Sequence, residues 1–373
     1  MTFSITLDSK DLKDFAGCIV KSIKRPTYVY FTVKDKHLYL CSKAYDASVF
    51  FVVESEQSSE VRIGVNTSEF ISAMSKLNRD ELTLNISKKK VEMVIGNVTI
   101  SYATVAADGV DTELPYVGEG LSSEGLSWFM NSLVMCSQSI ESIVKDDIRF
   151  QDVLLSSGDF AYMTRFTETA VAVSASAAMN FTGRVVIPSS AAKMVKAFKS
   201  SINQCTIGSK TVTFILERAE GIHASTIRVD FPFMEDNYPV DCLSFLHLNS
   251  SLPLISQDSG YYFQRDHLLQ ALDLLSSIVK DESQVKFEII GDQDNGDLVW
   301  RLSAISVKGT YCEELVASTK GLKMEPFFLH GKKTIKALEL YGEEVVFYNR
   351  TQSIIALAGD NGNNLILLSK GVR

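Results

Sequence analysis

Hydrophobic residues in segment 188–201 recur every three or four positions, which is the period of an α-helix. The segment reads PSSAAKMVKAFKSS, and its apolar residues share one helical face while Lys193, Lys196 and Lys199 share another. Pro188 suits the first turn of a helix, and the serines that follow it suit the cap. The pattern predicts an amphipathic helix with a basic solvent face.

The same arrangement, a helix accompanied by strands, occurs six times along the chain. Strands are predicted where apolar and polar residues alternate, and helices where the apolar residues keep the helical period. A repeat of roughly sixty residues is too long for a solenoid, and two such units make a domain of ordinary size. The units occupy segments 3–54, 61–104, 121–175, 183–232, 261–307 and 326–370.

Pairs of these units predict three domains, at 1–120, 121–250 and 251–373, with seams rich in Gly, Ser or Pro. In the second unit, Asn66 followed by Glu69 is typical of a capping box at a helix start. Asn-Gly turns at 294–297 and 359–364 predict hairpins, so the strands should pair antiparallel. The predicted fold class is α+β.

Composition places the chain among ordinary globular proteins, with 46% hydrophobic and 22% charged residues. No apolar run approaches the roughly 18–20 residues that span a bilayer, and the segment MTFSITLDSKDL does not read as a secretory signal. The six cysteines are scattered without a C-x-x-C pair, which favours reduced thiols over a disulfide framework. We therefore expect a cytoplasmic protein that makes no contact with membranes.

The distribution of charge is more informative about function than the composition. The basic residues cluster on predicted helices although the formal net charge is −8. The first, second, fourth and sixth helices each have a basic face, whereas the third carries almost no charge and the fifth presents Asp266, Gln270 and Asp273. For one helix, a solvated face is the ordinary explanation. Repetition in four of six helices predicts one electropositive surface on an acidic protein, suited to a polyanion bound without sequence preference.

Catalytic signatures are absent from the sequence. It contains no G-x-G-x-x-G, G-x-x-x-x-G-K-[ST], H-E-x-x-H or G-x-S-x-G motif, and the five histidines have no metal-ligand spacing. The stretch GDQDNGD lacks two of the ligands of a calcium loop and fits a hairpin turn better. We expect no enzymatic activity, no cofactor and no metal.

Several segments, taken in order, resemble the bacterial β sliding clamp, the ring-shaped processivity factor of replicative DNA polymerases. They are KRPTYVYF, VRIGVNTSEFISAMSKL, ISYATVAAD, DIRFQDVLL, GRVVIPSSAAKMVKAF and FMEDNYPV. The resemblance spans the whole chain at low identity. Segment 164–173 lacks the family's Gly-His-Arg, and the chain ends in LLSKGVR rather than a Met-Pro-x-Arg tail. Such divergence is compatible with a bacterial, phage or plasmid origin.

The resemblance implies three repeated domains, each with two helices lining a hole and antiparallel sheets outside. Two chains would close a ring around double-stranded DNA, a clamp loader ATPase would open it, and DNA polymerase would bind through a peptide. DNA contacts are implied for Lys10, Lys13, Lys21, Lys24, Arg25, Lys76, Arg79, Lys145, Arg149, Lys193, Lys196 and Lys199.

The resemblance also implies two protein interfaces. The partner-peptide pocket would comprise Thr164, Phe166, Val171, Pro239, Leu243, Leu367 and Leu368. The homodimer interface would comprise Ile100, Tyr102, Leu274 and Leu275. For the apolar members of both sets, an ordinary core position is the alternative. Two other functions stay open: a clamp-like protein–protein scaffold without DNA, and an enzyme with an unrecognised site.

Overall fold

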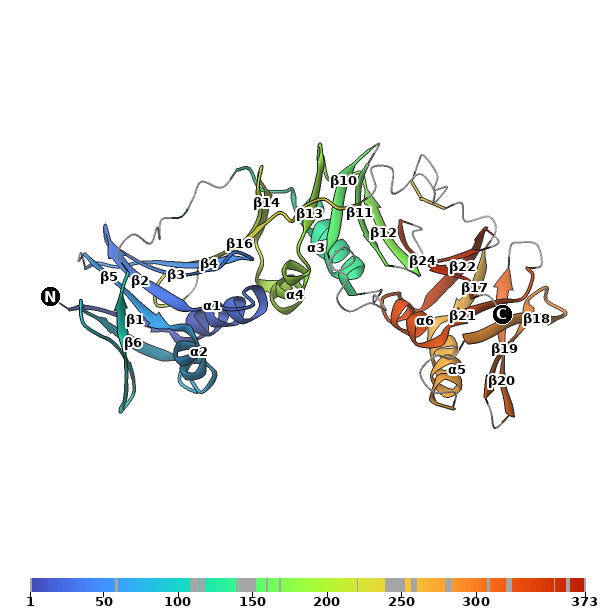
Figure 1. The fold of residues 1–373 in the computed structure, drawn as a ribbon, viewed down its shortest axis with the longest axis horizontal. Coiled ribbons are helices and arrows are strands. Elements are labelled where there is room, and N and C mark those ends of the chain that lie inside the picture. The colour runs from blue at the N-terminus through green and yellow to red at the C-terminus, as the bar shows by residue number, and fades with distance from the viewer. Residues whose placement is uncertain are drawn as a thin grey trace. The chain divides into compact units, whose positions relative to one another are not determined.

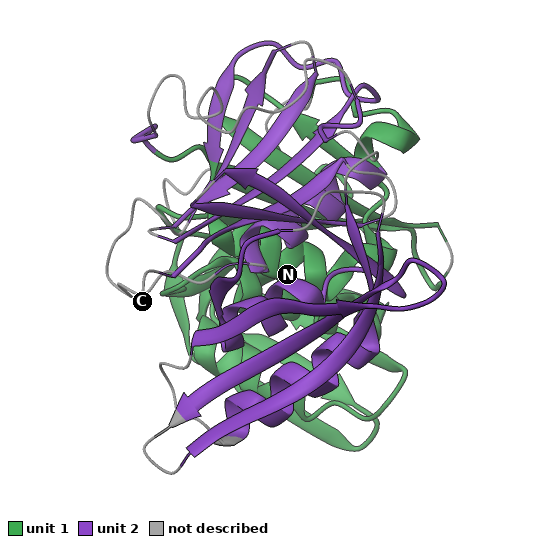
Figure 2. Cartoon of the chain, turned by 90° about the vertical axis from the view of Figure 1, so that its right-hand side faces the viewer, with its two compact units in different colours: residues 1–126, 187–234 green, residues 127–186, 235–373 purple. Residues whose placement is uncertain are grey.

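The computed structural model contains two compact units, and each unit combines two separate stretches of the chain. Unit 1 comprises residues 1–126 and 187–234, and unit 2 comprises residues 127–186 and 235–373 (Figure 2). The residues that the structure describes are 2–57, 60–107, 114, 118–138, 140, 152–158, 160–167, 169–219, 221–238, 252–255, 260–278, 284–306, 309–319, 324–351, 353–359 and 363–371.

Unit 1 contains three helices and two sheets within its described residues. The helices are α1 (Ser9–Ser22), α2 (Thr67–Ser75) and α4 (Ser189–Phe198), and a short 3₁₀ helix (Lys199–Ser201) follows α4. The strands are β1 (Phe3–Asp8), β2 (Tyr28–Lys34), β3 (His37–Lys43), β4 (Ser48–Glu54), β5 (Val61–Asn66), β6 (Glu81–Ile86), β7 (Val91–Ile95), β8 (Val98–Tyr102), β9 (Thr104–Ala106), β14 (Gln204–Ile207), β15 (Thr211–Arg218) and β16 (Ser225–Pro232).

The strands of unit 1 pair antiparallel in two sheets. The larger has eight described strands in the order β14-β15-β16-β4-β3-β2-β5-β9, and the smaller has the order β1-β6-β7-β8. The ladder between β4 and β16 pairs Val53 with Ser225, so it joins the first predicted domain to the second. The predicted division into three domains therefore does not coincide with the two compact units, and it stays a prediction.

Helix α1 is central to unit 1, where it packs against α2, α4 and strands of both sheets (Figure 1). Leu12, Phe15 and Ile19 are fully buried, as their spacing predicts. Helix α4 packs against α1 at a position without a side chain: a Cβ built on Gly17 would lie 2.8 Å from Cζ of Phe198. Glycine here lets the ring of Phe198 approach the α1 backbone directly.

Two predicted helix starts have different outcomes. The Asn66 cap is confirmed, because its Oδ1 accepts hydrogen bonds from the amides of Ser68 and Glu69. The serine cap predicted for α4 is wrong. The helix begins at Ser189, so Pro188 occupies the cap position and supplies no side-chain acceptor.

Unit 2 contains most of α3 (Ser123–Gln138) together with α5 (Arg265–Ile278) and α6 (Gly331–Leu338). Its described strands form one sheet in the order β13-β10-β11-β12-β24-β23-β22-β17-β20-β19-β18-β21. Their bounds are β10 (Val153–Ser157), β11 (Ala161–Phe166), β12 (Ala170–Ser176), β13 (Arg184–Ile187), β17 (Tyr261–Gln264), β18 (Gln284–Asp292), β19 (Leu298–Ser306), β20 (Gly309–Thr319), β21 (Phe327–His330), β22 (Glu344–Thr351), β23 (Ile354–Ala358) and β24 (Asn364–Ser369).

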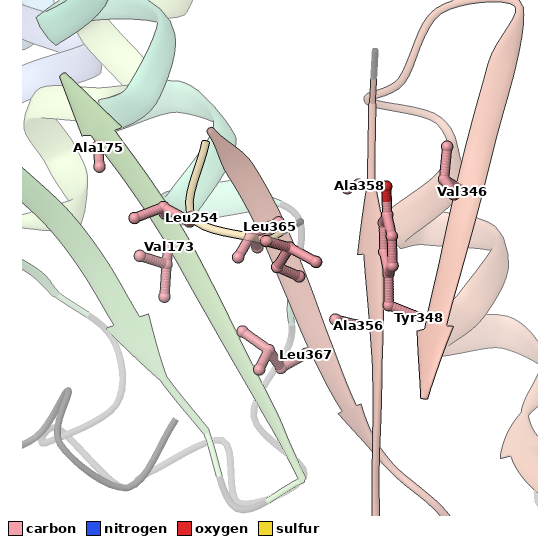
Figure 3. Close-up of a cluster of buried hydrophobic side chains, with 10 residues drawn as sticks. Val173, Ala175, Leu254, Val346, Tyr348, Ala356, Ala358, Leu365 and Leu367 are labelled. Carbon is pink, nitrogen blue, oxygen red and sulfur yellow. The ribbon is translucent and has the colours of Figure 1, made fainter. Parts of the chain in front are cut away.

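The pairing of β12 with β24 joins the second and third predicted domains inside unit 2. Apolar side chains cover this joint, among them Val173, Leu365 and Leu367 (Figure 3). On the helix side the hydroxyl of Ser174 accepts from Nε1 of Trp128 at 3.0 Å and donates to Oδ1 of Asn364 at 2.6 Å. These contacts tie α3, β12 and β24 together.

The structure is α+β with large antiparallel sheets, as predicted. The hairpin predicted at 294–297 joins β18 and β19, and Gly296 takes the positive φ that the turn requires. No helix among the described residues is both long and apolar enough to cross a bilayer.

Candidate nucleic-acid interface and partner groove

The basic face of α1 is open to solvent. Lys10, Lys21, Lys24 and Arg25 are exposed, and Lys13 is half-buried. The apolar face points into the core, so the helical period alone places these cations outward. The backbone amide of Lys24 is fixed by a hydrogen bond of 2.9 Å to the Asp46 carboxylate, which positions the residues that follow α1.

The acidic side chains of α1 are compensated within unit 1. Arg218, at the end of β15, bonds the carboxylate of Asp11 and that of Asp14, the latter at 2.9 Å. Asp11 also accepts from the hydroxyl of Ser225 at 2.8 Å. Burial raises the pKa of Asp14, and the nearby guanidinium of Arg218 opposes that rise. The two carboxylates thus contact Arg218, whereas Lys10 and Lys21 of the same helix are exposed to solvent.

Helix α4 adds its lysines to the same unit. Lys193, Lys196 and Lys199 are exposed. Phe198 packs on Gly17, which lies one helical turn from both Lys13 and Lys21. The contact therefore brings the end of α4, including Lys199, next to the basic face of α1.

The other predicted cations differ in solvent exposure, and two of them lie outside the described residues. Lys76 and Arg79, which follow α2, are exposed. Lys145 and Arg149 lie outside the described residues. In unit 2, Lys333 of α6 is half-buried, and its Nζ donates a hydrogen bond to Oγ1 of Thr169 at 2.6 Å. This lysine therefore already bonds a residue of its own unit.

Four residues of the predicted partner-peptide pocket lie on one face of the sheet in unit 2. On β11, β12 and β24, Phe166 is paired with Val171 and Val171 with Leu367, so all three side chains point the same way. Thr164 shares this face two residues from Phe166. Val171 is half-buried and packs against the apolar clusters on both sides of it.

Leu368 lies on the opposite face of β24. There it lines a pocket of about 210 Å³ together with His330, Lys333 and Thr334. Pro239 and Leu243, also predicted for the groove, lie outside the described residues.

Tyr238 packs beside Phe166 of the predicted partner-peptide pocket, although the sequence analysis did not select it. Its ring centroid lies 5.6 Å from that of Phe166, and its hydroxyl donates to the carbonyl of Asp152 at 2.6 Å. Arg184 holds the preceding segment through the Asp236 carboxylate and the Tyr238 carbonyl. The bond from Arg184, together with one from the Tyr238 amide, lowers the pKa of Asp236 below its usual value. The signal was present in FMEDNYPV, where an aromatic residue stands next to the selected proline.

The predicted dimer residues divide into accessible and buried side chains. Leu274 is 51% exposed, whereas Leu275 and Tyr102 are buried in their own units. Ile100 is half-buried on β8, the edge strand of the smaller sheet, where Val98 is 58% exposed. An open edge with apolar side chains suits pairing with another chain. Val98 and Leu274 are therefore the accessible apolar residues of the two predicted surfaces.

Among the described residues, no group of three or more His, Cys, Asp or Glu side chains is arranged to hold a metal ion. Four of the five described cysteines are buried and Cys312 is exposed, while Cys242 lies outside the described residues.

Comparison with known proteins identifies the fold. No protein-family model matches the chain, and no curated protein sequence matches it. Among solved structures, the DNA polymerase III β subunits of Thermotoga maritima and Pseudomonas aeruginosa are 15% and 14% identical, each with a TM-score of 0.77 and 100% of both chains covered. The DNA polymerase sliding clamp of Bacillus subtilis is 14% identical, with a TM-score of 0.74 over 100% of both chains. This chain therefore has the fold of the DNA polymerase III β sliding clamps.

Proposed function

We propose that this chain is a non-enzymatic sliding clamp that encircles duplex DNA and tethers DNA polymerase to it. Two copies would close the ring, with domains at 1–120, 121–250 and 251–373 and two helices of each domain facing the hole. The clamp fold over the whole chain supports this assignment. The DNA contacts would be those predicted, with Lys145 and Arg149 included.

The observation that carries the proposal is the division of charge on α1. Asp11 and Asp14 are bonded by Arg218, while Lys10, Lys21, Lys24 and Arg25 are exposed to solvent. Exposed lysines bind phosphates by displacing condensed counterions, without reading the base sequence. Hydrated contacts of this kind can form and break as a ring moves along the duplex.

The groove on β11, β12 and β24 would receive the polymerase. Val171 is half-buried between the buried side chains of Phe166 and Leu367, and the half-buried Tyr238 ring packs beside Phe166. The apolar anchors of a short peptide would bind against Val171 and Tyr238. A separate clamp loader ATPase would open the ring, because the sequence contains no phosphate-binding loop.

Duplex binding at several salt concentrations tests the DNA assignment. Replacing Arg25 with Ala should reduce the slope of log K against log salt by about 1, equally on all sequences. Lys24→Glu combined with Arg25→Glu should reduce both affinity and slope further. The matched control is Lys88→Glu with Lys89→Glu, which changes the same charge on exposed residues of the β6–β7 turn.

Unchanged affinity and salt slope in the Lys24/Arg25 variant would contradict the proposed DNA surface. A clamp-like scaffold that binds only proteins would give that result. Retention of a loaded ring on closed circular DNA should fall less than the affinity does, because the topological link persists when a phosphate contact is removed.

A further inference from the structure

An exposed tyrosine stands beside the cations that follow α1. Tyr45 is 79% exposed, more than any other large apolar or aromatic side chain in the described part of the chain. It lies in the turn between β3 and β4, which a hydrogen bond of 2.9 Å from the Ala44 amide to the Ala47 carbonyl closes. The fold thus holds an aromatic ring in water on a short, fixed turn.

This turn is attached to the segment that carries Lys24 and Arg25. Asp46, next to Tyr45, is buried and accepts from the Lys24 amide at 2.9 Å. One aspartate side chain and one Cα–Cα step separate the two, so the Cα of Tyr45 lies within about 10 Å of that amide. Stacked nucleotides rise by about 3.4 Å each, and roughly three of them cover this distance.

We propose that Tyr45, with Lys24 and Arg25, forms a binding site for single-stranded DNA, in which a nucleobase stacks on the ring and the cations hold the adjacent phosphates. A single exposed apolar side chain is ordinary on a protein surface. An aromatic ring combined with exposed cations at this spacing has the two components by which proteins bind unpaired strands without sequence preference.

The ligand is an unpaired strand because base pairing and stacking hide the flat faces of bases inside a duplex. The site rests on the proposed function, since Lys24 and Arg25 are also assigned to duplex phosphates. It adds to that function a contact with the single strand that continues from a duplex end.

The experiment compares a short labelled oligothymidylate with an abasic strand of equal length and with a blunt duplex. Both single strands present the same phosphates, so the difference between their affinities measures the contribution of the bases. The wild-type protein should bind oligothymidylate at least about fivefold more tightly than the abasic strand, the lower limit for one base–aromatic stack.

Tyr45→Ala and Tyr45→Leu should erase this difference, and Tyr45→Phe should keep it. Duplex affinity should stay the same in all three variants. Tyr311→Ala, which removes a half-buried tyrosine of β20 in unit 2, is the control and should change nothing. The leucine variant keeps an apolar side chain in the turn without an aromatic face.

The proposal is overturned if Tyr45→Ala and Tyr45→Leu retain the preference for oligothymidylate, if Tyr45→Phe loses it as alanine does, or if duplex affinity falls in parallel. Failure of the proposed clamp function has a different signature: the wild-type protein would not bind the duplex, or would bind it independently of Lys24 and Arg25.

Discussion

Replacing Arg218 with Met should destabilise unit 1 through the carboxylates of α1. Arg218 bonds both Asp11 and Asp14, and the Asp11 side chain is only 4% exposed. Methionine preserves much of the length and apolar contact of the arginine stem but removes all of its donors. The variant therefore isolates the loss of the ion pairs.

The expected cost at neutral pH is about 3 kcal/mol. Removing one partner of a buried ion pair costs about 3–5 kcal/mol, because the other charge stays buried without compensation. The lower end applies here, since the Arg218 side chain keeps 27% of its surface exposed and Asp11 retains its bond from Ser225.

The cost should shrink as the pH falls. Burial raises the folded-state pKa of Asp14, and loss of the Arg218 guanidinium removes the charge that opposes this rise. A raised folded-state pKa means that the protonated carboxyl favours folding and that this advantage is lost as the pH rises through that pKa. The difference between variant and wild type should therefore be largest near pH 7 and smaller near pH 4.

Urea unfolding followed by both fluorescence and circular dichroism separates the stability of unit 1 from that of unit 2. Both tryptophans, Trp128 and Trp300, belong to unit 2, so their fluorescence reports that unit, whereas far-ultraviolet circular dichroism reports both units. The variant should shift the circular dichroism transition of unit 1 and leave the tryptophan transition unchanged. Arg301→Met is the control, because its pair with Glu314 is exposed and should contribute little to stability.

Two outcomes would refute this reasoning. One is a loss no larger than that of Arg301→Met, which would mean that water compensates Asp11 and Asp14 as well as Arg218 does. The other is a loss that does not change between pH 7 and pH 4, which would separate the role of Arg218 from its charge.

Three further predictions concern unit 2 and the proposed ring. Leu274→Lys should convert a dimer into a folded monomer in analytical ultracentrifugation, because an unpaired charge in an interface is costly, while Leu340→Lys should leave the dimer intact; an unchanged mass would contradict the interface. Arg184→Met should lower stability at neutral pH by about 1 kcal/mol, and this difference should vanish as the pH falls through the lowered folded-state pKa of Asp236; tryptophan-detected urea unfolding at pH 7 and pH 3 measures it. Ser174→Ala should cost about 1–3 kcal/mol by the same assay, since Trp128, Asn364 and the buried Ser132 lose hydrogen bonds, and a value near zero would exclude a structural role for the hydroxyl.

The helices and their exposed faces were predictable because the helical period assigns each side chain to core or solvent. Lys21 and Lys193 are exposed for this reason, and Phe15 is buried. Leu274 and Leu275 follow the same rule. Leu275 continues the spacing of the buried residues Leu268, Ala271 and Leu272, whereas Leu274 falls outside that face and is accessible.

Pairings between distant segments were not predictable. Alternation indicates which face of a strand is buried, but it does not identify the neighbouring strand. Nothing in the sequence around Asp11 indicates that Arg218 is its partner, because the two residues are brought together by the fold. For the same reason the sequence analysis selected Pro239 and not Tyr238, whose contact with Phe166 is formed only in the folded structure.

The interleaving of the two units has a consequence for synthesis on the ribosome. Strand β4 pairs with β16, so the eight-stranded sheet of unit 1 stays incomplete until residue 232 has left the exit tunnel. Strand β12 must wait longer, because its partner β24 is the last strand of the chain. During elongation, β4 and β12 therefore present unpaired edges with apolar side chains, a state prone to aggregation. A ribosome stalled near residue 120 or residue 250 would hold nascent strands that lack their partners rather than a finished domain.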